Sequence, residues 1–239
     1  MQNTYIWNQF NLYRNKIILL AVFLFSGLQS FAQYTAETNL PYYDDKFIHY
    51  GFTLGIGSSR FKVKHSELYM QDSAMHARAP YTAMATIGLI ANFRIEGFWD
   101  LRVLPTVAFY QRKVDYEFAG GHNSSQVTES TFIEVPILLK YKSQRRKNAR
   151  MFMVAGVKPG IEAGAKKREK KETDLRTQNI DLAIDYGFGF DIYYQFFKFS
   201  PELRFSHGLA NLLVNDPNPY AQSLRRITSH SVTLYLHFN

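Results

Sequence analysis

The sequence has 239 residues, of which 46% are hydrophobic and 20% are charged, and its formal net charge at pH 7 is +8. This balance excludes an intrinsically disordered chain and a charged coiled coil. Aromatic residues make up 16% of the chain. Because Tyr and Phe favour pleated, half-buried surfaces, the composition favours an all-β fold.

The first residues have the pattern of a secretory signal peptide. Arg14 and Lys16 precede an apolar run over 17–25, and small residues follow at the spacing of a cleavage site. The run is too short for a membrane anchor, and no later run reaches the roughly 18 apolar residues of a spanning helix. We predict three parts in chain order: a cleaved signal peptide at 1–32, a periplasmic N-terminal segment at 33–47 and a single domain at 48–239.

The chain contains no cysteine. Disulfides, thiolate nucleophiles, thiolate metal sites and a lipidated cysteine are therefore excluded. The positive charge does not indicate nucleic-acid binding, because an exported chain meets no nucleic acid and the charges do not form one stripe.

From residue 51 onward, apolar side chains alternate with polar or small ones. In the clearest stretch, Leu182, Ile184 and Tyr186 alternate with Ala183 and Asp185, whereas a helix would repeat at every third or fourth residue. The stretch from 151 to 161 is the least regular. The alternation predicts eight strands, at 51–57, 82–94, 101–112, 133–142, 151–161, 182–194, 197–205 and 231–238.

Strand and connection lengths decide between a soluble sandwich and a membrane barrel. Runs of about ten to fourteen residues suit tilted strands that cross a bilayer, and sandwich strands are shorter. Long and short connections also alternate strictly, as in an outer-membrane barrel. The long connections are 62–80, 114–130, 162–180 and 207–227, and the short ones are 95–100, 143–150 and 195–196. We predict an all-β, eight-stranded antiparallel up-and-down transmembrane β-barrel in the outer membrane of a Gram-negative cell.

Aromatic residues gather at the strand ends beside the short turns, and we expect them to share one rim at the membrane interface. They are Tyr50, Phe52, Phe93, Phe98, Trp99, Tyr141, Phe152, Tyr193, Tyr194, Phe196, Phe197 and Phe238.

Prolines inside the predicted strands argue against a closed barrel, because they lack a ladder donor and a barrel has no edge strand. We expect β-bulges to accommodate them. They are Pro105, Pro136, Pro159 and Pro201.

Side chains are expected to fill the lumen of so small a barrel, which argues against open diffusion. Charged residues fall in the inward phase, and we predict a lumen ion-pair network as packing; a transport or catalytic site is the less favoured alternative. The candidate residues are Arg94, Arg102, Glu134, Lys140, Asp185, Asp191, Glu202 and Arg204, with Arg112 and Lys198 also inward.

No arrangement of residues predicts an enzyme. His207 and Asp185 are the best catalytic pair, but His207 is out of phase with the inward residues of its strand. Metal-binding spacing of histidines, a phosphate loop and a dinucleotide fingerprint are all missing from the sequence. We predict no catalytic residue, no cofactor, no metal and no small-molecule substrate.

Two basic clusters are candidates for contact with anions. Lys166, Lys167, Arg168, Lys170 and Lys171 are predicted in an outward loop that binds lipopolysaccharide phosphates or a partner, the alternative being a solvated loop. The same two interpretations apply to Arg145, Arg146 and Lys147, which are predicted in a periplasmic turn.

Several segments resemble the PorT (SprT) proteins of Bacteroidota, and the resemblance covers nearly the whole mature chain. The most specific are 39–46 with 49–52 (NLPYYDDK and HYGF) and 202–212 (ELRFSHGLANL); 132–141 and 185–191 are also similar. The resemblance implies a non-enzymatic outer-membrane component of the type IX secretion system, which exports proteins with a C-terminal sorting domain and in some members supports gliding motility. It implies that the barrel anchors or assembles the machinery, with outer-membrane lipid and other secretion-system proteins as partners. The alternative is a general small barrel for adhesion or membrane integrity.

Overall fold

The structure is a computed structural model in which contacts separate residues 38–239, a compact unit, from residues 1–37. The signal peptide predicted at 1–32 lies outside the described residues, as does the beginning of the segment predicted at 33–47. The described residues are 38–65, 75–118, 123–163, 177–214 and 224–239.

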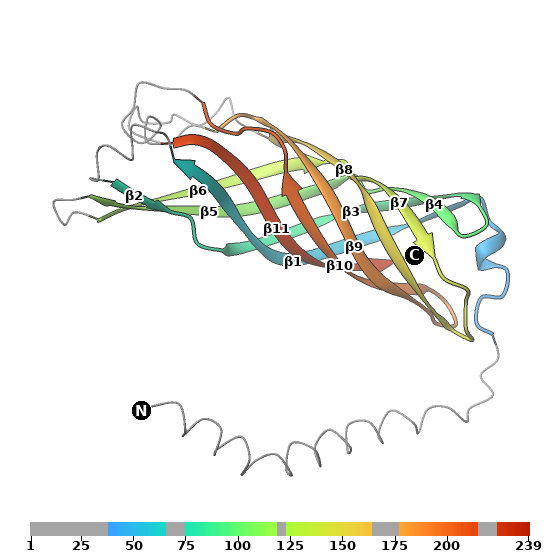
Figure 1. The fold of residues 1–239 in the computed structure, drawn as a ribbon. Coiled ribbons are helices and arrows are strands. Elements are labelled where there is room, and N and C mark those ends of the chain that lie inside the picture. Colours follow the sequence, from blue (N-terminus) through green and yellow to red (C-terminus); the bar gives the residue numbers. More distant parts are fainter. Residues whose placement is uncertain (1–37, 66–74, 119–122, 164–176, 215–223) are drawn as a thin grey trace, which may run out of the picture. The chain divides into compact units, whose positions relative to one another are not determined.

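The described residues of the unit 38–239 form one antiparallel sheet that closes into a barrel (Figure 1). Neighbouring strands follow the order β2-β5-β6-β8-β7-β4-β3-β1-β11-β10-β9, and pairings of β8 with β9 and of β3 with β5 complete the closure. Among these residues, no helix is long and apolar enough to cross a membrane. The elements are η2 (Tyr43–Asp45), β1 (Ile48–His65), β2 (Met75–Arg78), β3 (Thr82–Glu96), β4 (Trp99–Val103), β5 (Thr106–Phe118), β6 (Asn123–Glu134), β7 (Ile137–Lys142), β8 (Ala149–Ala163), β9 (Ile180–Tyr193), β10 (Lys198–Gly208) and β11 (Leu224–Phe238).

The predicted all-β antiparallel barrel is confirmed, but the predicted count of eight strands is wrong, because the sheet has 11. Two predicted strands are each divided at a proline: Leu104 and Pro105 separate β4 from β5, and Val135 and Pro136 separate β6 from β7. The third additional strand is β2, a short strand that pairs with the far end of β5.

The proline breaks contain no β-bulge, so the expected bulges are wrong at these positions. Before Pro105, Val103 pairs with Ala91; after it, Thr106 pairs with Gly88. Both strands advance by three residues across the break, so the register is unchanged. A proline can therefore lie in this closed sheet at the cost of a two-residue gap in the ladder.

Proline carbonyl groups still accept hydrogen bonds from neighbouring strands. The N–H of Leu89 donates to the Pro105 oxygen, and the N–H of Val135 donates to the Pro159 oxygen, both at 3.0 Å. Pro159 and Pro201 remain inside β8 and β10. What each proline removes is one donor, while its acceptor continues to hold the sheet together.

Burial alternates along the strands with polar side chains inside. In β9, Asp185 and Asp191 are fully buried, whereas Ile184 and Phe188 are more than 40% exposed. This is the reverse of a soluble protein and is the pattern of a barrel whose outer face contacts lipid. β8 alternates as strictly as β9; its sequence pattern is less regular because the inward residues include the apolar Phe152.

The strands extend further than the apolar pattern predicts. The connection predicted at 114–130 is mostly strand, because β5 continues to Phe118 and β6 begins at Asn123. Polar residues such as Asp115 and Ser125 pair in this ladder. The alternation of apolar residues ends before the strands end, because residues beyond the lipid-facing belt contact water and are not stabilised by an apolar side chain on the outer face.

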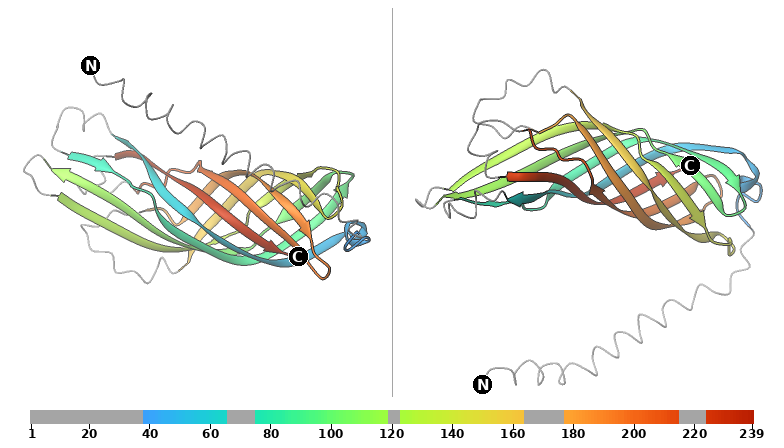
Figure 2. Two further views of the ribbon diagram at one scale, coloured as in Figure 1. Left: turned by 90° about the horizontal axis from the view of Figure 1, so that it is seen from below. Right: turned by 45° about the horizontal axis from the view of Figure 1, so that its top comes forward.

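The barrel has two distinct ends (Figures 1 and 2). The turns at 97–98, 143–148 and 194–197 and the C-terminal residue Asn239 define what we call the short-turn end. The connections from β1 to β3, β5 to β6, β8 to β9 and β10 to β11 define the long-connection end.

Most of the predicted aromatic rim lies on the outer face of the short-turn end, but Phe152 and Tyr193 do not. These two are 2% and 1% exposed and point into the lumen, where the Phe152 ring lies 3.9 Å from the Lys140 ammonium. Phe93 and Phe238 are partly buried. The exposed members of the predicted rim are Tyr50, Phe52, Phe98, Trp99, Tyr141, Tyr194, Phe196 and Phe197.

The close approach of β3 to the Pro105 break predicts a specific sensitivity to side-chain size. A Cβ at Gly88 would collide with the Pro105 carbonyl oxygen and lie 2.7 Å from the Thr106 Cα. We expect Gly88→Ala to lower the free energy of unfolding by about 1–3 kcal/mol, measured by urea titration in lipid vesicles. Ala85→Val on the exposed face of the same strand is the control and should change it by less than about 0.5 kcal/mol. Equal effects of the two variants would contradict this account.

Candidate functional site: a charged lumen closed at both ends

The centre of the lumen is organised around Glu202 of β10. Its carboxylate forms an ion pair with Arg102 of β4, accepts hydrogen bonds from Arg204, with the Nε atom at 2.7 Å, and lies 3.2 Å from His237 Nε2. All four side chains are at most 2% exposed. Arg102 also donates from Nε to the Asn92 side-chain oxygen at 2.7 Å.

This ion pair crosses the whole lumen. In the closed strand order, β4 and β10 lie on opposite sides of the barrel, separated by β3, β1 and β11 in one direction. A direct contact between Arg102 and Glu202 therefore bridges and obstructs the lumen at this level. Two buried charges also need excellent geometry to offset the loss of hydration, which the additional partners of Glu202 supply.

Towards the short-turn end, Asp191 of β9 organises a second cluster. Both of its oxygens lie 2.8 Å from Lys140 Nζ, and it also accepts hydrogen bonds from Arg150 Nε at 2.9 Å and Ser200 Oγ at 2.7 Å. Nearby, Lys142 pairs with Asp100 at 2.6 Å.

Towards the long-connection end, Glu134 organises a third cluster. It accepts a hydrogen bond from Tyr110 Oη at 2.6 Å and lies 3.4 Å from Lys158 Nζ. The Arg112 guanidinium lies 4.2 Å from the Tyr110 ring centroid and 4.8 Å from that of Phe61. These cation–π contacts join the charged lumen to an apolar region beyond it.

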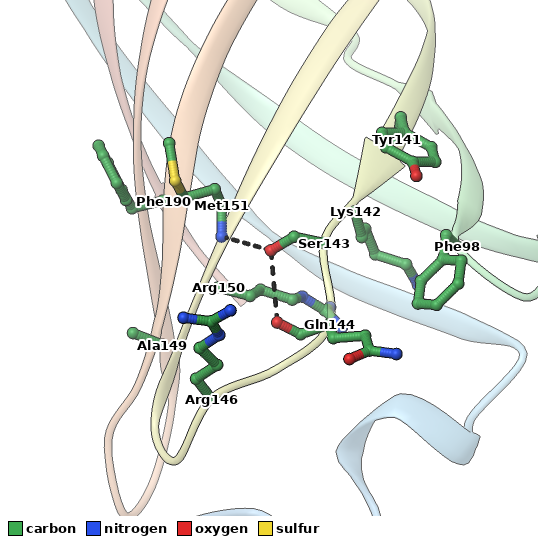
Figure 3. Close-up of a pocket in the computed structure, with 10 residues that line it drawn as sticks. All are labelled: Phe98, Tyr141, Lys142, Ser143, Gln144, Arg146, Ala149, Arg150, Met151 and Phe190. Carbon is green, nitrogen blue, oxygen red and sulfur yellow. Dashed lines mark hydrogen bonds between the residues drawn. The ribbon is translucent and has the colours of Figure 1, made fainter.

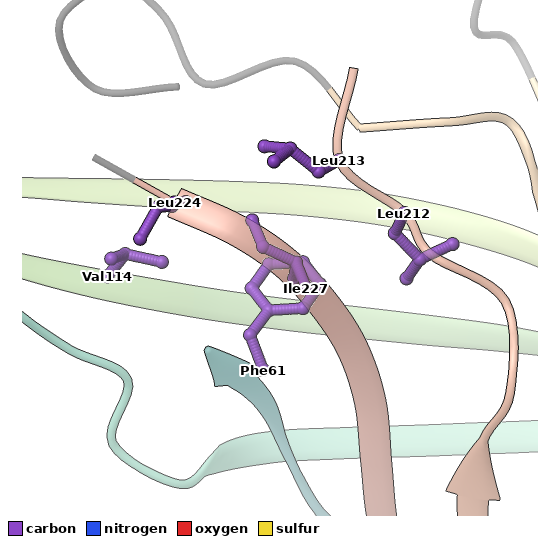
Figure 4. Packing of buried hydrophobic residues seen from close by; sticks show 6 residues of the cluster. All are labelled: Phe61, Val114, Leu212, Leu213, Leu224 and Ile227. Carbon is purple, nitrogen blue, oxygen red and sulfur yellow. The ribbon is translucent and has the colours of Figure 1, made fainter. Parts of the chain in front are cut away.

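An apolar cluster closes the long-connection end (Figure 4). Leu212 and Leu213 lie in the segment after β10, which folds back so that the N–H of Leu212 donates to the Ile227 oxygen at 2.8 Å. Packed apolar side chains therefore occupy this level of the barrel. The cluster consists of Phe61, Val114, Leu212, Leu213, Leu224 and Ile227.

The N-terminal segment 38–47 closes the short-turn end. Asp44 in η2 forms two hydrogen bonds with Arg150, at 2.9 and 3.1 Å, and accepts another from Tyr193 Oη at 3.1 Å. The Tyr43 ring stacks on His49 with centroids 4.2 Å apart. The described part of the predicted periplasmic segment is thus packed against the mouth of the barrel.

Turn residues and β3 hold the two ends of this segment. Arg145 donates to the backbone oxygens of Asn39 and Leu40, and Arg94 donates to the backbone oxygen of Asp44 at 2.8 Å. We call residues 38–47 the mouth segment below.

Asp44 also completes the charge balance of the lumen. Among the described residues, the buried cations number eight and the buried anions seven, so one anion is needed for neutrality. Burial would raise the pKa of Asp44, but the charge and hydrogen bonds of Arg150, with the charge of Lys142, hold it below its usual value. Asp44 is therefore ionised at neutral pH and supplies the missing negative charge.

A pocket of about 760 Å³ lies beside the turn that joins β7 and β8 (Figure 3). Basic side chains and apolar side chains line it together, and Ser143 Oγ accepts a hydrogen bond from the Met151 N–H at 3.1 Å. The lining residues are Phe98, Tyr141, Lys142, Ser143, Gln144, Arg146, Ala149, Arg150, Met151 and Phe190.

The structure places seven of the eight predicted lumen residues in these buried clusters and puts Arg94 elsewhere. Asp185 is buried 3.9 Å from Arg204, whereas the Arg94 side chain is 40% exposed at the mouth and contacts Asp44 and Asp45. The predicted contact residues Lys166, Lys167, Arg168, Lys170 and Lys171 lie outside the described residues.

His207 and Asp185 do not form a catalytic pair. His207 is exposed on the outer face, where its ring contacts Tyr186 Oη at 2.9 Å and His230 Nδ1 at 2.7 Å, and Asp185 is fully buried in the lumen. Within the described part of the chain, no group of three or more His, Asp or Glu side chains is arranged to hold a metal ion.

Sequence reasoning did not select several charged residues that the structure places in the network. Arg150 and Lys158 share the inward phase of β8 with Phe152, and the alternation would have predicted them if Phe152 had been counted as an inward residue. Asp44 precedes the first strand and carries no periodic signal, so only the tertiary structure brings it to Arg150.

A closed antiparallel sheet with an apolar outer face and a charged, filled lumen defines an integral outer-membrane barrel. The sequence model of the family described as outer membrane protein beta-barrel domain matches residues 31–214, and the chain belongs to this family. No curated protein matches the sequence.

The solved structures similar to this chain include the following three. Neisserial surface protein A is 9% identical, with a TM-score of 0.43, and the match covers 80% of this chain and 98% of that chain. OprG from Pseudomonas aeruginosa is 13% identical, with a TM-score of 0.42 and coverage of 80% and 90%. Ail of Yersinia pestis is 11% identical, with a TM-score of 0.32 and coverage of 79% and 97%.

The central ion pair predicts a strong dependence of stability on Glu202. Glu202→Gln leaves the buried Arg102 and Arg204 without their carboxylate partner, so we expect the free energy of unfolding to fall by about 3–5 kcal/mol. Glu96→Gln, at the exposed last residue of β3, is the control and should change it by less than about 0.5 kcal/mol. Urea titration in vesicles measures both, and a loss below about 1 kcal/mol for Glu202→Gln would contradict the central role of this carboxylate.

The mouth segment is predicted to depend on Asp44 and on pH. A carboxylate with a lowered pKa in the docked state stabilises docking at neutral pH, and this stabilisation is lost as the pH falls below about 4 and through the lowered value. We expect Asp44→Asn to raise amide hydrogen exchange of residues 39–46 at pH 7 at least about fivefold, equivalent to roughly 1 kcal/mol.

Asp45→Asn is the matched control for Asp44→Asn. Asp45 is 72% exposed and lies 3.8 Å from Arg94, so exchange should stay within about twofold of wild type. Equal exchange in the two variants would show that Asp44 does not hold the segment.

Proposed function

We propose that this protein is a non-enzymatic structural barrel of the outer membrane that acts through its surfaces, in membrane integrity or adhesion, and does not act as an open pore. The observation that carries the proposal is the buried Arg102–Glu202 pair, which joins opposite sides of the lumen. The apolar cluster at one end and the mouth segment at the other support it further. If these three levels obstruct the lumen, other molecules can contact the barrel only at its rims and on its outer face.

Export through a cleaved signal peptide at 1–32 is part of this proposal. The sequence pattern around Arg14 and Lys16 supports it, and membership of an outer-membrane family is consistent with an exported chain. The proposed partners are outer-membrane lipid and proteins that contact the rims.

A second candidate function is a role in type IX secretion, in which the barrel anchors or assembles the export machinery and in some cells supports gliding. One observation favours it: the most specific segment of the PorT (SprT) resemblance, 39–46 with 49–52, coincides with the mouth segment and the start of β1. A motif that covers the lumen at the short-turn end would present a distinct surface to a periplasmic partner.

Deletion of the gene in its host separates the two functions. If the barrel maintains the membrane, the mutant should become sensitive to detergent and large antibiotics, or lose surface attachment, while proteins with C-terminal sorting domains still reach the medium. If the barrel serves secretion, those proteins should accumulate in the periplasm while the outer membrane stays sealed.

Proteomics of the medium and the periplasm, with a dye-exclusion assay, measures both outcomes. Complementation with the wild-type gene is the control. Normal export together with normal permeability and attachment would contradict both functions.

A further inference from the structure

Basic side chains gather on the outer face of the barrel near the long-connection end. Arg60, Lys62 and Lys64 follow one another on the exposed face of β1, and the facing strand β11 contributes Arg226 and His230. Register places Arg60 opposite His230 and Lys64 opposite Arg226. We call these five residues the outer basic patch.

The patch lies directly beyond the lipid-facing belt of the same strand. The outward residues of β1 are apolar or aromatic from Tyr50 to Ile56, then Ser58, then Arg60. Arg60 lies ten residue steps after Tyr50, which at roughly 3.3 Å per residue and a tilt of about 40° corresponds to about 25 Å along the membrane normal. That distance equals the height of the apolar band of an outer-membrane barrel, so Arg60 lies at the level of the lipid headgroups.

The positive charges of the patch are not balanced by the described part of the chain. None of Arg60, Lys62, Lys64 and Arg226 forms an ion pair with an acidic residue there. The outward neighbours of Arg60 on the β3 side are Tyr81, which directly precedes β3, and Ala83. Like charges directly opposite each other on paired strands destabilise a sheet. An external anion would relieve this repulsion.

Two contacts orient the cations of the patch. The Arg60 guanidinium lies 4.5 Å from the Tyr81 ring centroid, and Arg226 donates to the Leu209 oxygen at 2.6 Å. A stacked guanidinium keeps donors free for a tetrahedral anion, and Arg binds phosphate groups in a bidentate manner.

We propose that the outer basic patch binds the phosphate groups of lipid headgroups in the outer leaflet. A phosphorylated lipid matches both parts of the surface, because its acyl chains can lie on the apolar belt of β1 and β11 while its phosphates meet the cations beyond it. This inference goes beyond the proposed function and does not depend on it, since either role requires a barrel held in the membrane. It concerns residues other than the lysine-rich segment 166–171 of the sequence.

The test measures lipid retention by the full mature chain refolded in detergent micelles. The probe is bis-phosphorylated lipid A, compared with the same lipid after removal of both phosphates, and native mass spectrometry measures the bound fraction. The test variant carries Arg60→Gln and Lys62→Gln. The control variant carries Lys46→Gln and Lys113→Gln, which removes the same charge outside the patch: Lys46 is exposed at the short-turn end, and Lys113 is already paired with Asp115 at 3.0 Å.

We expect wild-type protein to bind the phosphorylated lipid at least about tenfold more tightly than the dephosphorylated one, in a salt-sensitive manner. The test variant should lose about tenfold or more, because each cation at a charged lipid surface contributes about a fivefold factor. The control variant should stay within about twofold of wild type, and circular dichroism should show that both variants are folded.

Three results would overturn the proposal. Equal retention of the two lipids would show that phosphate is not recognised, and equal losses in the two variants would show only a general charge effect. Displacement of the lipid by inorganic phosphate at similar concentration would identify a site for the free anion, not for a lipid headgroup.

Discussion

Backbone hydrogen bonding in a membrane is the constraint on which the rest of this structure depends. The hydrocarbon layer offers no water to unpaired N–H and C=O groups, so strands can cross it only in a sheet without edges. Here closure is completed by the pairing of β8 with β9. Once the sheet is closed, every strand has one face towards lipid and one towards a narrow lumen, and the alternation of side chains follows.

The narrow lumen determines the chemistry of the inward residues. Polar and charged side chains pointing inward cannot reach bulk water in a barrel of this size, so each must find a partner across or along the lumen. Glu202, Asp191 and Glu134 each organise several cations, and the three clusters follow one another along the barrel. Asp44 supplies one further negative charge from outside the strands, which couples the mouth segment to the electrostatics of the interior.

Because side chains fill the lumen, the surfaces available for function are on the outside of the barrel. The aromatic side chains at the short-turn end and the outer basic patch at the long-connection end lie on either side of the apolar belt. Aromatic rings suit one membrane interface and cations suit phosphates at the other. The pocket beside Arg146, the mouth segment and the outer basic patch are therefore the surfaces through which a barrel of this kind can contact lipids or proteins.

The fold class could be predicted from the amino-acid pattern alone, because period-two alternation, long runs and alternating connection lengths are local consequences of crossing a bilayer. The pattern also predicted which charges of β9 and β10 point inward, since the phase of a strand is set by neighbouring residues alone.

Three other features depend on contacts that only the folded chain makes. The strand register is unchanged across the breaks at Pro105 and Pro136, because each strand and its neighbour advance by the same number of residues. This could not be predicted without knowing which strand is the neighbour. Phe152 and Tyr193 lie in the lumen, where the Phe152 ring contacts Lys140 and the Tyr193 hydroxyl donates to Asp44. Aromatic character alone does not show whether a side chain faces the lumen or the outer rim. Asp44 meets Arg150 across 106 residues of sequence, and such a pairing has no local signal because it depends on where a closed barrel brings its mouth.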